Sequence, residues 1–280
     1  MNRAMFSGVA GLKAHQTKMD VIGNNIANIN TYGYKAQHAV FSDVFYQTLK
    51  GATNTTAAAT VGYGSKLAAI RSDMGSSSLQ STSNSMDVAI TGEGFFEVKN
   101  GNTSYYTKAG EFGFDPSTGN IVDVNGNTVQ GFKTSTDTTA TDLNLLSNAP
   151  TSVTGASPEE KLSTLKGISI GSDGSVNVTA PDGATYVAGY VALANFANPS
   201  GLQAAGSSYY EATADSGSAT SCKPGDNGTG ELQSSTLEMS NVDLASEFAD
   251  MITTERGFQA NSRIISVSDT MLEELINLKR

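Results

Sequence analysis

The sequence predicts an α+β fold, with discontinuous helices at the two chain ends and an all-β antiparallel domain between them. Two observations support this prediction. Apolar residues recur with spacings of three, four or seven near both termini, as they do along the buried face of a helix. The middle of the chain instead carries four Asn-Gly or Asp-Gly pairs between short β-branched and aromatic runs, which is typical of β-hairpins.

The first helix is predicted within residues 1–35. Its apolar stripe has the spacing of a heptad seam and consists of Met5, Val9, Leu12, Met19, Ile22, Ile26 and Ile29. We expect the helix to end within residues 28–33, because Asn side chains compete for backbone hydrogen bonds and Gly33 tolerates a positive φ. Residues 36–65 follow as a linker or arm, in which AVFSDVFYQTL forms either a short helix or an extended segment.

A second helix is predicted over residues 241–280, with Ser240 or Asn241 as its N-cap and Asp243 placed to complement the helix dipole. Glu255, Ser262 and Asp269 interrupt its register, but the stripe continues through Leu244, Phe248, Met251, Phe258, Ile265, Leu272 and Ile276. A helix with one apolar stripe must bury that stripe against a partner. We therefore expect the terminal stripes to form an assembly interface, by meeting each other or by meeting neighbouring copies.

Residues 66–240 are predicted to form the β-rich domain, because the apolar period there changes to two. The turn pairs are Asn100-Gly101, Asn125-Gly126, Asp173-Gly174 and Asp182-Gly183. Residues 134–158 and 213–230 are rich in small polar side chains and are expected to be surface loops. The TGEGFF segment at residues 91–96 lacks the spacing of a phosphate-binding loop, and it indicates the start of a strand with close backbone packing.

The residue content argues against an enzyme, a cofactor and a metal site. The two histidines, His15 and His38, lack the spacing of a metal site, and the single cysteine, Cys222, lies in a loop-like segment with no histidine nearby. Carboxylate pairs such as Glu93 and Glu97 are interpreted as a solvated face of an acidic chain. The formal net charge of −10, without any cluster of Lys and Arg, excludes nucleic acid as a partner. No apolar run is long enough to span a membrane.

A secreted β-rich adhesin or glycan-binding module is a further alternative. The adjacent tyrosines at 105–106 and 209–210 would offer faces on which a sugar could stack. Adjacent side chains on a strand point to opposite faces, however, so one tyrosine of each pair is expected in the core.

Three segments of the chain carry a strong resemblance to the bacterial flagellar axial proteins, the rod and hook family. The first is MDVIGNNIANINTYGYK at residues 19–35, in which the family motif residues are Asn24, Asn25, Ala27, Asn28, Thr31, Gly33 and Lys35. The second is SMDVAITGEGFF at residues 85–96, and the third covers residues 238–280. Within the family, GNTVQGF and the ending IISVSDTMLEELINLKR look most like the short hook protein of Gram-positive bacteria.

The resemblance implies a D0-type coiled-coil domain from residues 1–35 and 241–280 and a D1-type β domain from residues 66–240. It implies a structural subunit of the flagellar hook, a flexible helical tube that transmits torque from rod to filament. A distal rod subunit of the basal body is the alternative. The implied partners are copies of the chain itself, the distal rod, hook cap and hook–filament junction proteins, and the flagellar type III export apparatus. The implied location is the extracellular hook of the bacterial flagellum.

Overall fold

The computed structural model describes residues 2–51, 57–134, 137, 139–150, 153 and 157–278. The chain divides into two compact units. The helical unit takes residues 1–29, 35–73 and 242–280, and the β unit takes residues 30–34 and 74–241. The predicted α+β class, with terminal helices and an antiparallel β middle, is confirmed.

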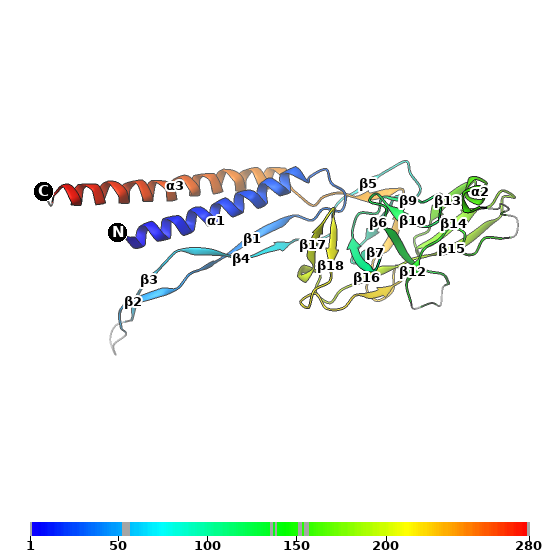
Figure 1. The fold of residues 1–280 in the computed structure, drawn as a ribbon, viewed down its shortest axis with the longest axis horizontal. Helices are drawn as coiled ribbons and strands as arrows, with labels where there is room; N and C mark the ends of the chain where they lie inside the picture. Colours follow the sequence, from blue (N-terminus) through cyan, green and yellow to red (C-terminus); the bar gives the residue numbers. More distant parts are fainter. Residues whose placement is uncertain are drawn as a thin grey trace. The chain divides into compact units, whose positions relative to one another are not determined.

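The helical unit is built on two long helices, α1 (Asn2–Ala27) and α3 (Leu244–Asn277), which lie side by side (Figure 1). The N-cap of α3 is Asp243, whose side chain accepts a hydrogen bond from the Ala245 N–H at 2.9 Å. The prediction of Ser240 or Asn241 as the cap was wrong. The backbone is still extended at Asp243, so the helix begins at Leu244, and the Asp243 carboxylate itself accepts from a backbone N–H that has no partner within the helix.

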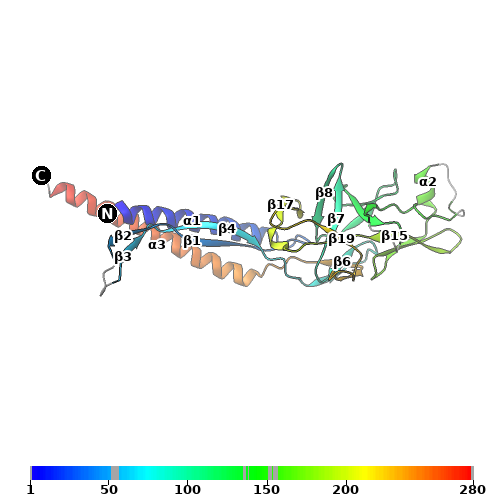
Figure 2. The ribbon, with the colours of Figure 1, turned by 90° about the horizontal axis from the view of Figure 1, so that it is seen from below.

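An extended arm follows α1 and belongs to the helical unit. It consists of β1 (Gln37–Asp43), β2 (Tyr46–Lys50), β3 (Ala59–Gly62) and β4 (Ser65–Ser72). β1 pairs with β4 and β2 pairs with β3, both antiparallel, and β1 and β4 run along α1 (Figure 2). The division of the chain differs here from the predicted boundary at residue 66, because pairing with β1 keeps residues 66–73 in the helical unit.

The regular structure in the described part of the β unit consists mostly of antiparallel strands. They are β5 (Leu79–Ser81), β6 (Val88–Thr91), β7 (Phe95–Asn100), β8 (Thr103–Thr107), β9 (Phe112–Phe114), β10 (Ile121–Asp123), β11 (Thr128–Phe132), β12 (Thr141–Asp142), β13 (Gly167–Ile170), β14 (Ser175–Thr179), β15 (Thr185–Val191), β16 (Leu193–Asn195), β17 (Gln203–Gly206), β18 (Tyr209–Glu211), β19 (Thr220–Cys222), β20 (Glu231–Ser234) and β21 (Thr236–Glu238). The main sheet runs in the order β13-β14-β15-β11-β7-β8-β18-β17. The strand pairs β6–β20 and β5–β21 bring the two ends of the unit's sequence together.

All four predicted turns join consecutive strands. Gly101, Gly126, Gly174 and Gly183 have φ values between 59° and 89°, the left-handed region that glycine adopts without strain. The TGEGFF segment starts β7, as predicted, and a Cβ on Gly92 would lie 3.1 Å from the Gly230 Cα.

The central strands of the main sheet bury side chains on both faces. Tyr105 and Tyr209 pack with one cluster of apolar side chains, and Tyr106 and Tyr210 pack with the other. Tyr106, Tyr209 and Tyr210 are all buried, and their rings contact neighbouring aromatic rings instead of solvent. The opposite orientation of adjacent tyrosines is confirmed. The expectation of one core tyrosine in each pair was wrong for residues 209–210, because both side chains are buried, one in each cluster.

The two segments predicted as loops contain more structure than expected. Residues 134–158 include β12 and the buried Leu143 and Leu145, and a short helix, α2 (Pro158–Ser163), starts at their end, although residues 135–136, 138, 151–152 and 154–156 lie outside the described part. Residues 213–230 contain β19, and a 3₁₀ turn at Pro199–Gly201 lies outside both segments. Cys222, expected in a loop, ends β19 and is buried beside the Leu193 carbonyl, and burial raises the pKa of its thiol.

Candidate assembly surfaces

α1 and α3 pack antiparallel through small residues. A Cβ on Gly8 would lie 3.2 Å from Ile265, one on Gly11 2.6 Å from the Asn261 side chain, and one on Gly257 2.7 Å from the His15 ring. Because three glycines face bulky partners across the seam, the two backbones approach closely. Further along, the Lys18 ammonium lies 3.4 Å from the Asp250 carboxylate.

Asn25 joins three elements of the helical unit. Its side-chain amide donates to the Gln37 carbonyl and to the Glu247 carboxylate, both at 2.9 Å, and its side-chain oxygen accepts from the Gln37 N–H at 3.0 Å. Asn25 and Glu247 are both buried, so each depends on the other for hydrogen bonding that water cannot supply. The end of α1, the start of β1 and the first turn of α3 are thereby tied together.

The other family motif residues shape the turn that follows α1. The Asn28 side chain donates to the Asn24 carbonyl and side-chain oxygen, each at 2.9 Å, which stabilises the last turn of the helix. Gly33 has a φ of 67°, and its N–H donates to the Glu238 carbonyl at 2.9 Å. Lys35 is buried, Thr31 is partly buried and Ala27 is exposed.

The structure divides the predicted interface residues between two environments. Ile22 is buried, and partial burial is found for Leu12, Met19, Ile26, Ile29, Met251, Ile265 and Leu272. The exposed members are Val9, Leu244, Phe248, Phe258 and Ile276. The helix pair of one chain therefore covers one part of the predicted stripe and leaves the rest open to solvent.

Sequence reasoning missed a second stripe on α3. It consists of Ile264, Val267, Met271, Leu275 and Leu278, all of which are at least 45% exposed. Their spacings of three and four place them on one side of the helix. This apolar spacing is present in the sequence. It was missed because only one heptad register was followed along the helix, in which Ser262 and Asp269 are interruptions.

Sequence reasoning also missed a buried ion pair in the β unit. The Lys108 ammonium lies 3.8 Å from the Glu238 carboxylate, with both side chains almost completely buried. Lys108 also donates to the Gly92 carbonyl at 2.9 Å, and Glu238 accepts from the Ser77 N–H at 2.9 Å. Together the two residues link the segments that precede β5 and β7 to β21.

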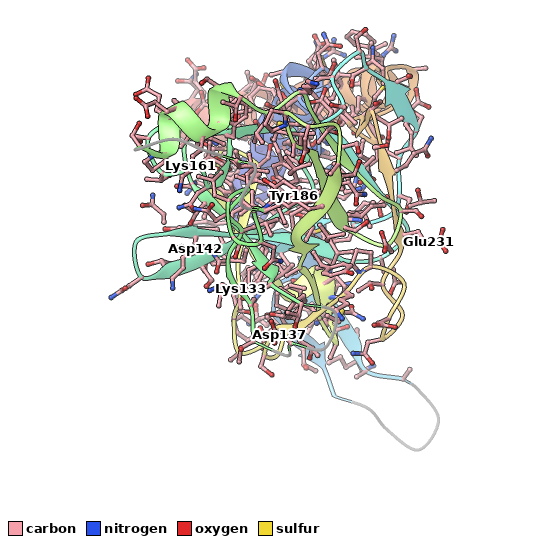
Figure 3. The ribbon with its side chains drawn as sticks, turned by 90° about the vertical axis from the view of Figure 1, so that its right-hand side faces the viewer. Lys133, Asp137, Asp142, Lys161, Tyr186 and Glu231 are labelled. Carbon is pink, nitrogen blue, oxygen red and sulfur yellow. The ribbon has the colours of Figure 1, made fainter. Side chains whose placement is uncertain are left out.

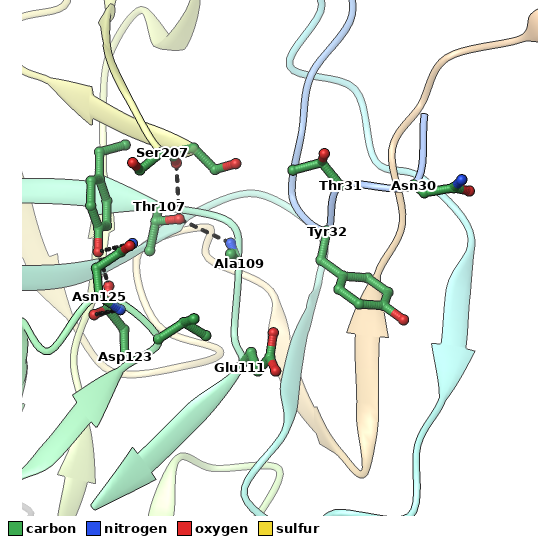
Figure 4. A pocket seen from close by; sticks show the side chains of 12 residues that line it. Asn30, Thr31, Tyr32, Thr107, Ala109, Glu111, Asp123, Asn125 and Ser207 are labelled. Carbon is green, nitrogen blue, oxygen red and sulfur yellow. Dashed lines mark hydrogen bonds between the residues drawn. The ribbon is translucent and has the colours of Figure 1, made fainter. Parts of the chain in front are cut away.

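A pocket of the β unit has a volume of about 380 Å³ and is lined in part by Thr31, Tyr32 and Glu111 (Figure 4). Three of its polar lining groups are paired with one another, since the Tyr209 hydroxyl bonds the side chains of Asp123 and Asn125.

The outer surface of the β unit carries dispersed charge. Lys133, Asp142 and Glu231 lie around its periphery as exposed side chains of both signs (Figure 3). Among the residues that the structure describes, no group of three His, Cys, Asp or Glu side chains is arranged to hold a metal ion. No helix in the described part of the chain is long and apolar enough to cross a membrane.

Family models match three parts of the chain. The model of the flagella basal body rod protein matches residues 5–35, and that of the flagellar hook protein FlgE/F/G D1 domain matches residues 89–178. The model of the flagellar basal body rod FlgEFG protein C-terminal region matches residues 233–278. These matches cover most of α1, the centre of the β unit and α3.

Characterised relatives match over the whole length. The flagellar basal-body rod protein FlgG of Bacillus subtilis is 41% identical over 287 residues, and that of Borreliella burgdorferi is 35% identical over 289 residues. The flagellar hook protein FlgE of Borreliella burgdorferi is 27% identical over 441 residues. All three alignments cover 100% of this chain and 100% of the relative.

Proposed function

The chain belongs to the family of flagellar rod and hook proteins, and from that premise we propose that it is a distal rod subunit of the bacterial flagellar basal body. Membership of this family makes the chain a structural subunit of the flagellar axis. The choice between rod and hook rests on how the chain aligns with each kind of relative.

One observation carries the proposal. The alignments with two rod proteins extend over 287 and 289 residues, close to the 280 residues of this chain. The alignment with the hook protein needs 441 residues, so that protein contains long stretches without a counterpart here. Identity is also higher with the rod proteins, at 41% and 35%, than with the hook protein, at 27%.

A hook subunit, the function that the sequence motifs favoured, is the second candidate function. The segment GNTVQGF and the final residues of the chain favoured it. Both features lie within or next to regions that are matched by family models common to rod and hook proteins. They therefore discriminate weakly between a rod protein and a hook protein. Chain length and end-to-end similarity are the stronger criteria.

The helical unit supports a role in polymerisation. α3 exposes an apolar stripe that its own chain leaves uncovered, and an exposed apolar surface of this kind is typical of an interaction site. Contacts between unlike surfaces of successive copies do not close, and they generate an open helical polymer. The β unit, with its own two-sided core and dispersed surface charge, would then decorate the polymer.

The family relationship also supports export through the flagellar type III apparatus and a location in the flagellum. We place the other rod and hook subunits next to this chain in the assembled axis. The single cysteine is compatible with passage as an unfolded chain, because no intrachain disulfide can form.

Electron microscopy of the purified chain under polymerising conditions tests the proposal. A rod subunit should give straight tubes, and a version truncated before Leu244 should give none. Curved tubes from the full chain would overturn the rod in favour of the hook. A chain that stays monomeric at every concentration and salt condition would contradict assembly altogether. Rescue of motility in Bacillus subtilis that lacks its own FlgG protein would give independent support.

A further inference from the structure

The helical unit contains an apolar groove between α1 and β4. It has a volume of about 270 Å³ and is lined by Ala10, Lys13, Ala14, Thr17, Val44, Ser65, Lys66 and Leu67. The floor is made of small or apolar side chains, and an exposed lysine stands on each wall, Lys13 on α1 and Lys66 on β4. The groove can therefore accept an apolar side chain that is accompanied by a negative charge.

Neither lysine is neutralised by the part of the chain that the structure describes. Among the described residues, no carboxylate lies within ion-pair distance of Lys13 or Lys66. The acidic residue closest to Lys66 in the strand register is Asp43, whose carboxylate takes the hydrogen bond of the Tyr46 hydroxyl. The groove thus presents two cations without a counter-ion.

α3 of the same chain does not fill this groove. It packs against the side of α1 that carries Gly8, Gly11 and His15, whereas the groove uses the side that carries Ala10, Ala14 and Thr17. Any helix that enters the groove must therefore come from another molecule.

The exposed stripe near the end of α3 has the chemistry that the groove requires. Met271, Leu275 and Leu278 are 45%, 49% and 82% exposed. Glu274 follows Met271 by three residues and precedes Leu278 by four, so its carboxylate flanks the same side of the helix. Glu273 lies around the helix from this stripe, since successive residues are about 100° apart.

We propose that the Met271–Leu278 stripe of one copy docks in the α1–β4 groove of the next copy, with Glu274 placed between Lys13 and Lys66. The inference rests on the proposed function, because it names the contact through which the rod subunit polymerises. Groove and stripe are unlike surfaces on one chain, so each added copy presents a new groove and a new stripe. Steering by the opposite charges also selects one register along the helix.

Charge reversal with the full chain tests the contact, and light scattering together with electron microscopy reports assembly. Glu274→Lys and the pair Lys13→Glu with Lys66→Glu should each raise the critical concentration for polymerisation by roughly tenfold or more. The combination of all three changes should restore assembly. Glu273→Lys, which makes the same change of charge off the stripe, is the matched control and should assemble like the unchanged chain. Circular dichroism establishes that every variant keeps its helices.

The outcomes separate this inference from the proposed function. If Glu274→Lys and the double lysine variant polymerise like the unchanged chain, or if Glu273→Lys is equally damaging, the groove contact is overturned while straight tubes still support a rod subunit. If both reversals abolish assembly and the triple variant does not recover, the pairing of these charges is overturned. Failure of the unchanged chain to polymerise would instead count against the proposed function.

Discussion

Asn25 and Glu247 lie 222 positions apart in the chain, and their buried side chains share a 2.9 Å hydrogen bond. The same amide bonds the backbone of Gln37 in both directions. One asparagine of the family motif therefore fixes where α1 ends, where the arm begins and where α3 starts. A motif residue that sequence alone marks only as part of a pattern thus has a definite structural role in the helical unit.

Asn25→Ala should lower the free energy of unfolding of the helical unit by about 2–3 kcal/mol, because it leaves a buried carboxylate and two backbone groups without their partner. Urea unfolding followed by far-ultraviolet circular dichroism measures the loss. Gln16→Ala, at an exposed position on the same helix, is the control and should change stability by less than about 0.5 kcal/mol. Equal effects of the two changes would refute the role of Asn25.

Gly23→Ala should stabilise the chain. Gly23 lies inside α1, has no positive φ, and a Cβ there would meet no atom within 4 Å. Alanine in a helix interior is more favourable than glycine by about 0.5–1 kcal/mol, because it loses less backbone freedom on folding. A rise in the urea midpoint checks this. At Gly110 the same change should be strongly destabilising, since the new Cβ would overlap the Val88 carbonyl.

Lys108→Met should cost the β unit about 3–5 kcal/mol, because it removes a buried ammonium that lies 3.8 Å from the buried Glu238 carboxylate. The double variant Lys108→Met with Glu238→Gln should lose less than the sum of the two single losses, since a neutral amide can still accept from Ser77. Chemical denaturation of all three variants gives the coupling energy. Strictly additive losses would show that the two charges do not depend on each other.

The stability of the β unit should fall at alkaline pH. Burial, aided by the neighbouring Tyr34 and Glu238, raises the pKa of Tyr210 to about 12. In the unfolded chain the phenol ionises near its ordinary value of about 10, so the unfolded state gives up this proton first as the pH rises. The contribution of Tyr210 to the free energy of unfolding is therefore complete below about pH 10 and is lost between about pH 10 and pH 12. Tyr210→Phe should remove this part of the alkaline decline, and an unchanged pH profile would contradict the assignment.

Local signals in the sequence predicted most of the fold. The four Asn-Gly and Asp-Gly turns were identified because a glycine with positive φ between β-branched runs is a short-range pattern. α1 ends at Ala27, just before the predicted range of residues 28–33, in which Asn28 bonds back to Asn24 and Gly33 has a positive φ. The two stripes located both helices, since periodicity is also a property of neighbouring residues.

The residues that sequence reasoning missed depend on contacts between distant segments. Glu247 and Glu238 are acidic residues that look solvated in the sequence, yet each is buried by a partner far along the chain. The closeness of α1 and α3 depends on glycines that weaken each helix when it is considered alone. The second stripe on α3 was overlooked because one helix was assumed to bury one face.

The predicted stripe on α3 contains two kinds of residue that mutation can separate. Ile265 packs against Gly8 across the helix pair, whereas Phe248 is 51% exposed. Ile265→Ala should therefore destabilise the unassembled chain by about 1–3 kcal/mol, as expected for a partly buried aliphatic side chain. Phe248→Ala should leave that stability within about 0.5 kcal/mol and should weaken polymerisation instead. Denaturation of the monomer and the critical concentration for tube formation, measured on both variants, distinguish the two roles. If Phe248→Ala unfolds the monomer and leaves assembly intact, its exposed face is not an assembly surface, and the polymer contacts must lie elsewhere on the helical unit.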